Sequence, residues 1–192
     1  ALAIHLAKQH EVKVWEFSKE RVEVCNFTRV NDLLSKVKIP FNVKYYIDIE
    51  ASLKDSEMVF MAVPSNNVKS TIESVKPFIG QDVLIVNCSK GFCEETGQAV
   101  YQLIEQVMER EVIVLGGPMH AEEVAEEHLS GAIIASKDIE LVKKVKHRIQ
   151  DHRLKLYISD DPLGVALGSS LKNILAILEI FRRYILGVTF EW

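Results

Sequence analysis

Short apolar runs alternate along this chain with longer segments of helical periodicity, and this alternation limits the possible folds more than any other feature. The runs are rich in β-branched residues and often apolar on both faces, which is typical of strands buried on both sides. Alternating strands and helices predict an α/β fold with a doubly wound, mostly parallel sheet. The expected strands are residues 12–17, 58–63, 83–88, 112–115, 132–135 and 154–158; the expected helices between them are residues 19–35, 66–78, 94–109, 121–129 and 138–150, with a loop at residues 40–43.

The end of the chain departs from this pattern. Asp160, Asp161 and Pro162 are helix start signals, and residues 163–186 after them predict one long, largely apolar helix. Such a helix suits a buried position at a domain junction. We therefore expect one domain over residues 1–159 and the first helix of an incomplete second domain over residues 160–192.

Composition and charge exclude several classes of protein. Of the 192 residues 48% are hydrophobic and 26% are charged, which is ordinary for a globular chain and supplies a sizeable core. The net charge is −4, and no clustered basic face suggests nucleic-acid binding. Acidic residues flank the one basic cluster, so we interpret it as a solvated helix face; it consists of Lys143, Lys144, Lys146 and Arg148.

The compartment follows from the cysteines and from the first residues. Three cysteines, Cys25, Cys88 and Cys93, form no disulfide framework or zinc pattern, which favours a reducing, cytoplasmic location. Residues 1–10 have the pattern of an amphipathic helix and lack the marks of a signal peptide, so we expect Ala1 to fall inside a longer protein. No apolar run reaches the ~18 residues of a membrane span.

In a doubly wound sheet, ligands bind beyond the carboxyl ends of the strands. Glu16 follows the first expected strand, where an acid can accept hydrogen bonds from the ribose of a dinucleotide. A glutamate exposed on a strand-to-helix loop is the alternative. The glycine-rich loop that would decide between them is not in this sequence.

Two further strand ends carry candidate ligands. Lys90 precedes a glycine on a short loop and can bind an anion, although a solvated lysine would look the same. Gly116, Gly117 and Pro118 lead into a helix with acids in its first turn, so backbone amides there can approach a ligand. His120 follows, and we favour a packing or loop role for it. Its spacing from the nearby acids and from His128 is not that of a zinc site, so we expect no metal.

Lys172 and Asn173 are polar residues inside the long apolar helix. Burying a lysine without a partner is costly, so Lys172 either faces a polar cleft or extends to solvent. A lysine in a cleft can exchange a proton with a carbonyl or hydroxyl oxygen.

These pieces occur in the order VPS, SKG, GGPMHAEEVA and SDDPLGVALGSSLKNILAI. In this order the chain resembles the bacterial type of NAD(P)-dependent glycerol-3-phosphate dehydrogenase, within the 6-phosphogluconate dehydrogenase-like superfamily, from Ala1 to about Ile177. The resemblance implies an NAD-binding Rossmann-type domain without its glycine-rich loop, followed by the start of an all-helical substrate domain. It implies reversible hydride transfer between NADH and dihydroxyacetone phosphate, giving sn-glycerol 3-phosphate for phospholipid synthesis.

The resemblance also implies roles for individual residues. Lys172 would be catalytic and would give a proton to the ketone oxygen. The acid at Glu16 favours NAD over NADP, because it repels a 2′-phosphate. Substrate-binding residues would be Lys90, Gly117 and Asn173, and cofactor-binding residues would be Glu16, Phe17, Lys90 and Ala121.

The chain departs from the family pattern at two places. Met119 stands where the family usually has serine or threonine, and the sequence after Ile177 no longer follows the family. Two alternatives therefore stay open: a related dehydrogenase, such as the 6-phosphogluconate or ketopantoate type, and an inactive nucleotide-binding module. The expected partners are a small phosphorylated substrate and a second copy of the chain in a homodimer.

Overall fold

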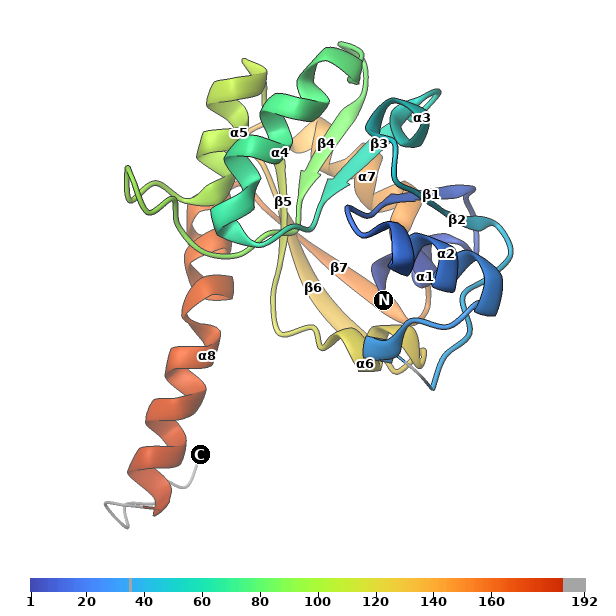
Figure 1. The fold of residues 1–192 in the computed structure, drawn as a ribbon. Coiled ribbons are helices and arrows are strands. Elements are labelled where there is room, and N and C mark those ends of the chain that lie inside the picture. Colours follow the sequence, from blue (N-terminus) through green and yellow to red (C-terminus); the bar gives the residue numbers. More distant parts are fainter. Residues whose placement is uncertain (35, 185–192) are drawn as a thin grey trace.

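The computed structural model describes residues 1–34 and 36–184, except for the side chains of residues 173–176 and 179–184. In this part of the chain, strands and helices alternate as the sequence predicts (Figure 1). The strands are β1 (Val12–Trp15), β2 (Val43–Tyr46), β3 (Met58–Met61), β4 (Leu84–Asn87), β5 (Ile113–Gly116), β6 (Ser130–Ala135) and β7 (Leu154–Ser159). The α-helices are α1 (Leu2–Leu6), α2 (Lys19–Thr28), α3 (Ile49–Leu53), α4 (Val68–Val75), α5 (Val100–Met108), α6 (Ala121–Ala125), α7 (Ile139–Ile149) and α8 (Pro162–Tyr184).

The strands form two sheets. β1 and β2 pair in parallel, and the other five strands form a second sheet in the order β3-β4-β5-β6-β7. Within the larger sheet only β5 and β6 pair antiparallel, with Leu115 opposite Ile134. The prediction of a mostly parallel α/β sheet is confirmed.

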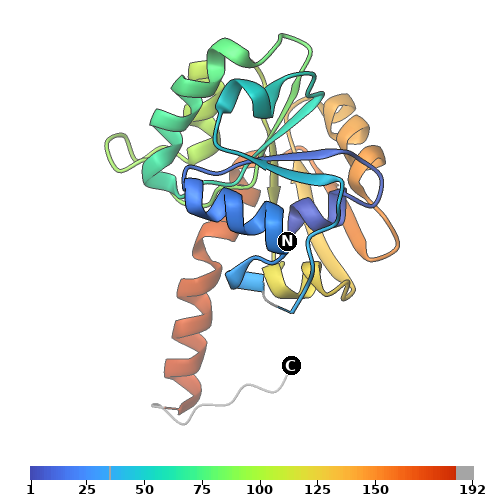
Figure 2. The same cartoon turned by 45° about the vertical axis from the view of Figure 1, so that its right-hand side comes forward.

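Helices cover both faces of the larger sheet, and the central strand shows why its sequence is apolar throughout (Figures 1 and 2). Successive side chains of a strand point to opposite faces. In β5 and the residue before it, Val112 and Val114 belong to the core cluster under α4 and α5. Ile113 and Leu115 belong to the cluster on the other face, with α1 and α7. A strand buried on both sides needs a continuous apolar run.

Two short elements escaped the sequence prediction. β2 begins at Val43, the last residue of the expected loop, and pairs with β1 along its whole length. Its polar Lys44 hides the strand pattern, although Val43 itself is fully buried. α3 has five residues and is capped by Asp48, whose carboxylate accepts a hydrogen bond of 3.1 Å from the Ala51 N–H. Hydrophobic periodicity does not detect a helix this short.

Several expected helices are shorter than predicted, because a residue with positive φ ends them or a loop delays them. α2 ends at Thr28, and Arg29 follows with φ 58° while its guanidinium donates to the Ile39 and Val43 carbonyls. The helix expected from residue 94 begins only at Val100, after a loop that contains Gly97 at φ 67°. α6 ends at Ala125 instead of residue 129.

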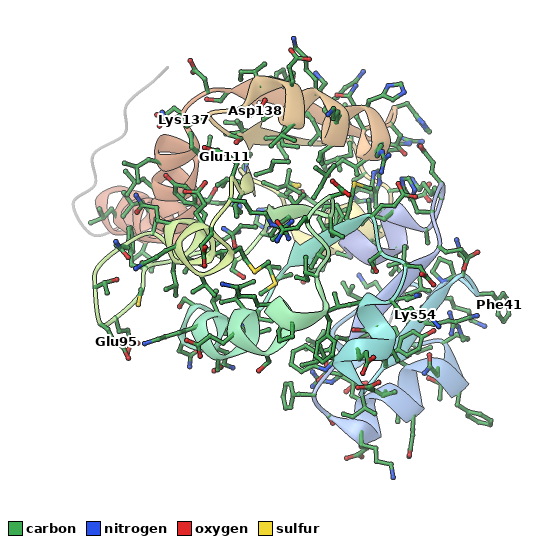
Figure 3. The ribbon with its side chains drawn as sticks, turned by 90° about the horizontal axis from the view of Figure 1, so that it is seen from above. Phe41, Lys54, Glu95, Glu111, Lys137 and Asp138 are labelled. Atoms are coloured by element: carbon green, nitrogen blue, oxygen red, sulfur yellow. The ribbon has the colours of Figure 1, made fainter. Side chains whose placement is uncertain are left out.

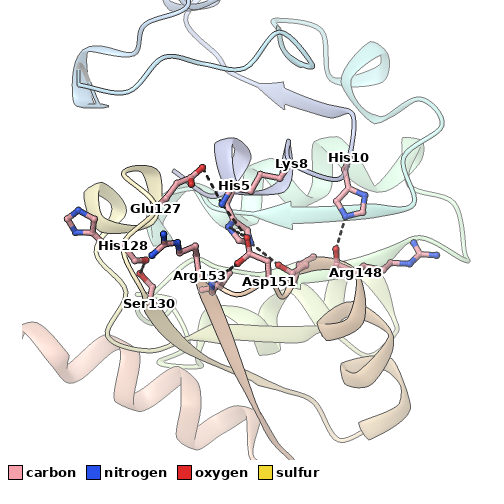
Figure 4. Close-up of polar contacts among 11 residues, drawn as sticks. His5, Lys8, His10, Glu127, His128, Ser130, Arg148, Asp151 and Arg153 are labelled. Carbon is pink, nitrogen blue, oxygen red and sulfur yellow. Dashed lines mark hydrogen bonds and ion pairs between the residues drawn. The ribbon is translucent and has the colours of Figure 1, made fainter.

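A polar cluster ties the amino-terminal helix α1 to the turn between α7 and β7 (Figure 4). The Asp151 carboxylate accepts hydrogen bonds from the Arg153 and Leu154 N–H groups at 2.8 and 2.7 Å, and from Lys8 at 3.2 Å. His5 adds a 2.8 Å bond to the Ile149 carbonyl. α1 is therefore fixed to the turn between α7 and β7.

A second polar cluster holds the turn after β6 (Figure 3). Ser136 donates to the Glu111 carboxylate at 2.9 Å and accepts from the Asp138 N–H at 3.3 Å. Lys137 donates to the Asp160 carbonyl at 3.3 Å, just before α8 begins. These bonds fix the place where the last helix starts.

The long helix expected over residues 163–186 is confirmed by α8, and the last two of those residues lie outside the described part of the chain. The Asp161 carboxylate accepts a 2.8 Å hydrogen bond from the Gly164 N–H and caps the helix. The first turns pack on the sheet, and the rest projects beyond the α/β body (Figures 1 and 2). Among the helices described, none has the length and apolar character needed to cross a membrane.

Candidate active site at the carboxyl ends of the strands

The loops after β4 and β5 lie at the same edge of the sheet, because these strands are parallel neighbours. α8 starts after β7, at the opposite edge, since β7 is parallel to β6 and β6 is antiparallel to β5. It then runs along the sheet, past Val165 in the core, until its middle reaches the two loops. The fold thus brings the polar stretch of the last helix to the edge where ligands bind in doubly wound sheets.

Two consecutive serines of α8 hold these loops. The Ser169 hydroxyl oxygen accepts a 3.0 Å hydrogen bond from the Gly117 N–H, and the Ser170 oxygen accepts a 2.9 Å bond from the Gly91 N–H. Neighbouring residues of a helix project about 100° apart, so each serine serves a different loop. The sequence analysis missed this pair. Its only signal was two hydroxyl side chains in an apolar helix directly before Leu171.

Glycines make the close approach of α8 possible. A Cβ on Gly116 would lie 2.2 Å from the Ser169 oxygen and 2.9 Å from a methyl of Val165. Gly117 has φ 125°, and a Cβ there would also press on the Ala132 Cα at 3.3 Å. The sequence predicted that backbone amides of this loop approach a ligand, which stays a prediction; in the structure the Gly117 N–H binds Ser169, and α8 is the element that approaches the loop.

Lys172 follows Ser169 by three residues and lies on the same face of α8. Its side chain is half-buried, and its Nζ lies 3.4 Å from Nε2 of His120. Lys172 therefore lies beside the loop after β5, and its placement in a polar cleft stays a prediction. His120 is at the N-cap position of α6 and exposed, without a capping hydrogen bond from its side chain.

Lys90 is exposed at the end of a loop that is itself rigid. Asn87 is buried at the end of β4, and its amide binds Ser89 twice, at 3.1 Å to the N–H and 3.0 Å to the carbonyl. The Ser89 hydroxyl donates to the Met61 carbonyl at 3.3 Å. Sequence reasoning did not single out Asn87. Its two bonds to Ser89 hold the backbone directly before Lys90.

Cys88 is the first residue of this loop. Burial raises the pKa of its thiol to about 12, against a smaller lowering by the charge of Lys90. The thiol therefore stays protonated and unreactive at neutral pH.

The remaining predicted residues of this edge are placed as follows. Ala121 is exposed and is the first residue of α6. Met119 is half-buried and packs on the core cluster that contains Leu115, so an apolar side chain fits at this position. Asn173 belongs to α8, but its side chain lies outside the described residues.

Glu16 and Phe17 lie apart from these groups, after the first strand of the two-stranded sheet. The Glu16 carboxylate accepts a 3.1 Å hydrogen bond from the Ser18 N–H and lies 3.5 Å from the Arg21 guanidinium. Its side chain is 16% exposed, whereas Phe17 is 75% exposed. An acid at a strand end beside an open aromatic ring suits the ribose and adenine of a dinucleotide.

The charges of the site suit an anionic ligand. Lys90 and Lys172 lie on the two elements that the serines hold together, and neither forms an ion pair within the described part of the chain. Ammonium groups without a protein carboxylate are available to a carbonyl oxygen or a phosphate.

Comparisons with known proteins agree with this geometry. Residues 1–142 match the family model described as "NAD-dependent glycerol-3-phosphate dehydrogenase N-terminus". The solved glycerol-3-phosphate dehydrogenase of Coxiella burnetii superposes with a TM-score of 0.86 at 30% identity, covering 92% of this chain and 55% of that one.

Two curated relatives carry the name glycerol-3-phosphate dehydrogenase [NAD(P)+]. The protein of Thermoanaerobacter sp. is 34% identical over 178 residues, and that of Clostridium acetobutylicum is 35% identical over 180 residues. Each alignment covers 92% of this chain but only 54% of the relative, so the chain spans about half the length of the relatives it matches. The match of sequence, fold and family model means that the chain belongs to the NAD-dependent glycerol-3-phosphate dehydrogenase family.

Proposed function

We propose that the complete protein carrying this chain reduces dihydroxyacetone phosphate with NADH to sn-glycerol 3-phosphate, reversibly. The observation that carries the proposal is the docking of α8, because Ser169 and Ser170 hold the Lys172 helix against both ligand loops. A dehydrogenase of a phosphorylated ketone needs a proton donor and an anion ligand at one edge of the sheet, and Lys172 and Lys90 supply them. The names of the relatives support this substrate.

Each site residue has a proposed role. A bound nicotinamide would supply the hydride for the C2 carbon of the ketone. Lys172 donates a proton from its ammonium group to the C2 oxygen as the carbonyl becomes an alcohol, and takes it back in the reverse reaction. Lys90 binds both substrate and cofactor, Gly117 and Asn173 bind substrate, and Ala121 lines the cofactor.

We propose NAD as the preferred dinucleotide, with NADP less suited. The negative charge of Glu16 disfavours a 2′-phosphate and its oxygens can accept the ribose hydroxyls. Arg21 lies beside the acid and is 40% exposed, so it is a nearby group that can attract a phosphate. Phe17 supports the adenosine half through its open ring.

The domain boundaries and the partners are part of the same proposal. Residues 1–159 form the nucleotide-binding domain, and residues 160–192 begin the helical substrate domain. In the described part of the chain β1 pairs with β2 alone and β3 with β4 alone, so both strands have a free edge. A strand and the glycine-rich loop before α1 would fit between these edges, in the strand order of dinucleotide-binding sheets.

We further propose a homodimer in the cytoplasm. Leu171, Ile177 and Leu178 of α8 are 42%, 66% and 57% exposed, and apolar side chains of this size favour burial against another element. Cys25, Cys88 and Cys93 are all free thiols, as in a reducing compartment.

A substrate panel tests the proposed function. NADH oxidation by the complete protein is followed with dihydroxyacetone phosphate and, separately, with ketopantoate; 6-phosphogluconate is assayed in the oxidative direction with NAD. We expect the highest kcat/KM for dihydroxyacetone phosphate. A higher value for either other substrate would mean a related dehydrogenase. NADH binding without any turnover would mean an inactive nucleotide-binding module, which Met119 and the divergent sequence after Ile177 favour slightly.

A further inference from the structure

The contact between His120 and Lys172 has no role in the reaction described so far. It joins residues 52 positions apart, with Nε2 of the imidazole 3.4 Å from Nζ of the lysine. Because an ammonium group only donates hydrogen bonds, the imidazole must be the acceptor when Lys172 is charged. A neutral histidine can accept through Nε2 when its proton is on Nδ1.

The contact follows from the register between α8 and the loop after β5. Ser169 holds Gly117, and three residues further along each segment Lys172 meets His120. A step of three on a helix keeps the same face, so one face of α8 makes both contacts. His120 thus makes a second contact between this loop and α8, besides the contact of Gly117.

The charge state of the imidazole matters to this contact. A protonated imidazole has no lone pair for Lys172 and would repel its ammonium group at this distance. The contact is therefore attractive only with a neutral imidazole.

Resting on the proposed reaction, we propose that His120 is a positioning residue: its neutral imidazole holds the Lys172 ammonium toward the substrate carbonyl. The role is positional because His120 acts through Lys172.

Two variants of the complete protein test the proposal. His120→Gln keeps a side-chain oxygen that can accept from Lys172 but does not titrate, and His120→Leu keeps volume without an acceptor. At pH 7.5 we expect His120→Leu to lose about 10- to 100-fold in kcat with NADH affinity unchanged. His120→Gln should stay within a few-fold of the wild type.

Two outcomes would overturn the positioning role. One is a His120→Leu variant with the kcat of the wild type. The other is a His120→Gln variant whose kcat falls as far as that of His120→Leu, because the side-chain acceptor would then not be what holds the lysine.

A measurement without turnover separates this proposal from the proposed function. ¹⁵N NMR of the imidazole reports which ring nitrogen carries the proton. We expect the Nδ1–H form of His120 in the wild type at pH 8 and a shift toward Nε2–H in Lys172→Ala. If the protein fails to reduce dihydroxyacetone phosphate, the proposed function fails, and an unchanged tautomer in Lys172→Ala would separately show that His120 does not hold this lysine.

Discussion

At the scale of single residues, the proposed preference for NAD over NADP rests on Glu16. Its carboxylate is held by the Ser18 N–H, with the Arg21 guanidinium at its other oxygen. Removing the acid leaves Arg21 free to bind a 2′-phosphate and removes an acceptor for the ribose. We expect Glu16→Ala to weaken NADH binding by about 10-fold, the scale of one hydrogen bond to a charged group, and to strengthen NADPH binding.

Dissociation constants from NADH and NADPH fluorescence titrations check this expectation. Arg21→Ala in the same background is the control, since it should cancel the gain for NADPH. A Glu16→Ala variant with an unchanged ratio of the two constants would remove Glu16 from the cofactor site.

Asp151 makes stability depend on acid pH. Burial alone raises the pKa of its carboxyl, but hydrogen bonds from the Leu154 and Arg153 N–H groups and from Lys8 outweigh burial and bring the pKa to about 2, below the ordinary 3.8. A pKa that is lower in the folded state stabilises the fold above the unfolded value and is lost as the pH falls through the folded value. The window is therefore pH 4 to pH 2.

We expect the wild type to lose on the order of 1–2 kcal/mol of unfolding free energy through this group across that window. Asp151→Asn keeps the shape of the side chain without the titration, so its acid curve should be flatter. Urea unfolding at pH 5, 4, 3 and 2 measures both proteins, and parallel curves would contradict the assignment.

Residue-level sequence reasoning singled out residues whose local setting is unusual, and it missed residues whose partners are distant in sequence. Lys90, Gly117 and Lys172 stand out because a lysine or a double glycine is unusual in its surroundings. Ser169 and Asn87 do not stand out, since serine and asparagine are common and their importance comes from partners that only the fold supplies.

At the scale of elements, the docking of α8 sets the geometry of the candidate site. Gly116 allows this docking because any side chain there meets Ser169 and Val165. We expect Gly116→Ala to push α8 outward and to lower kcat by more than 10-fold, because a displaced lysine no longer reaches the reacting oxygen. NADH affinity should change little.

A second substitution makes this prediction specific. Ser169→Gly removes the atom at 2.2 Å from the added methyl, so the double variant Gly116→Ala/Ser169→Gly should recover part of the lost kcat. Activity and thermal unfolding are measured for both single variants and the double. Strictly additive losses would contradict a steric origin, since coupled neighbours do not add.

Element prediction from sequence was reliable for long periodic segments and weak for short ones. α7 and α8 have several turns of consistent pattern and lie where expected. β2 and α3 have four and five residues, and pairing with β1 or a single cap decides their structure. Helix ends were missed where residues such as Arg29 take positive φ, a choice made by tertiary hydrogen bonds.

At the scale of the whole molecule, the projecting part of α8 leaves apolar side chains uncovered. Ile177 and Leu178 are 66% and 57% exposed. We expect this chain on its own to self-associate through that helix, and Ile177→Glu/Leu178→Glu to remain monomeric at the same concentration. Sedimentation velocity measures both, with Lys143→Glu on α7 as a surface control that leaves association unchanged. A monomeric wild type would contradict the expected association.

The alternation of strands and helices was enough to predict the layered architecture. It could not predict that β1 and β2 form a sheet of their own among the described residues, because pairing depends on which neighbours are present. The path of α8 back across the sheet was also hidden, since it depends on the antiparallel pairing of β6 with β5.

The central claim is that Lys172 transfers a proton in the reduction of dihydroxyacetone phosphate. The most direct test compares NADH oxidation by the complete wild-type protein and by Lys172→Ala, with NADH binding measured on both. We predict turnover in the wild type and a loss of about 10²- to 10⁴-fold in kcat for the variant, with NADH bound equally well. Turnover that survives in Lys172→Ala, or a wild type that binds NADH and does not reduce this ketone, would contradict the account.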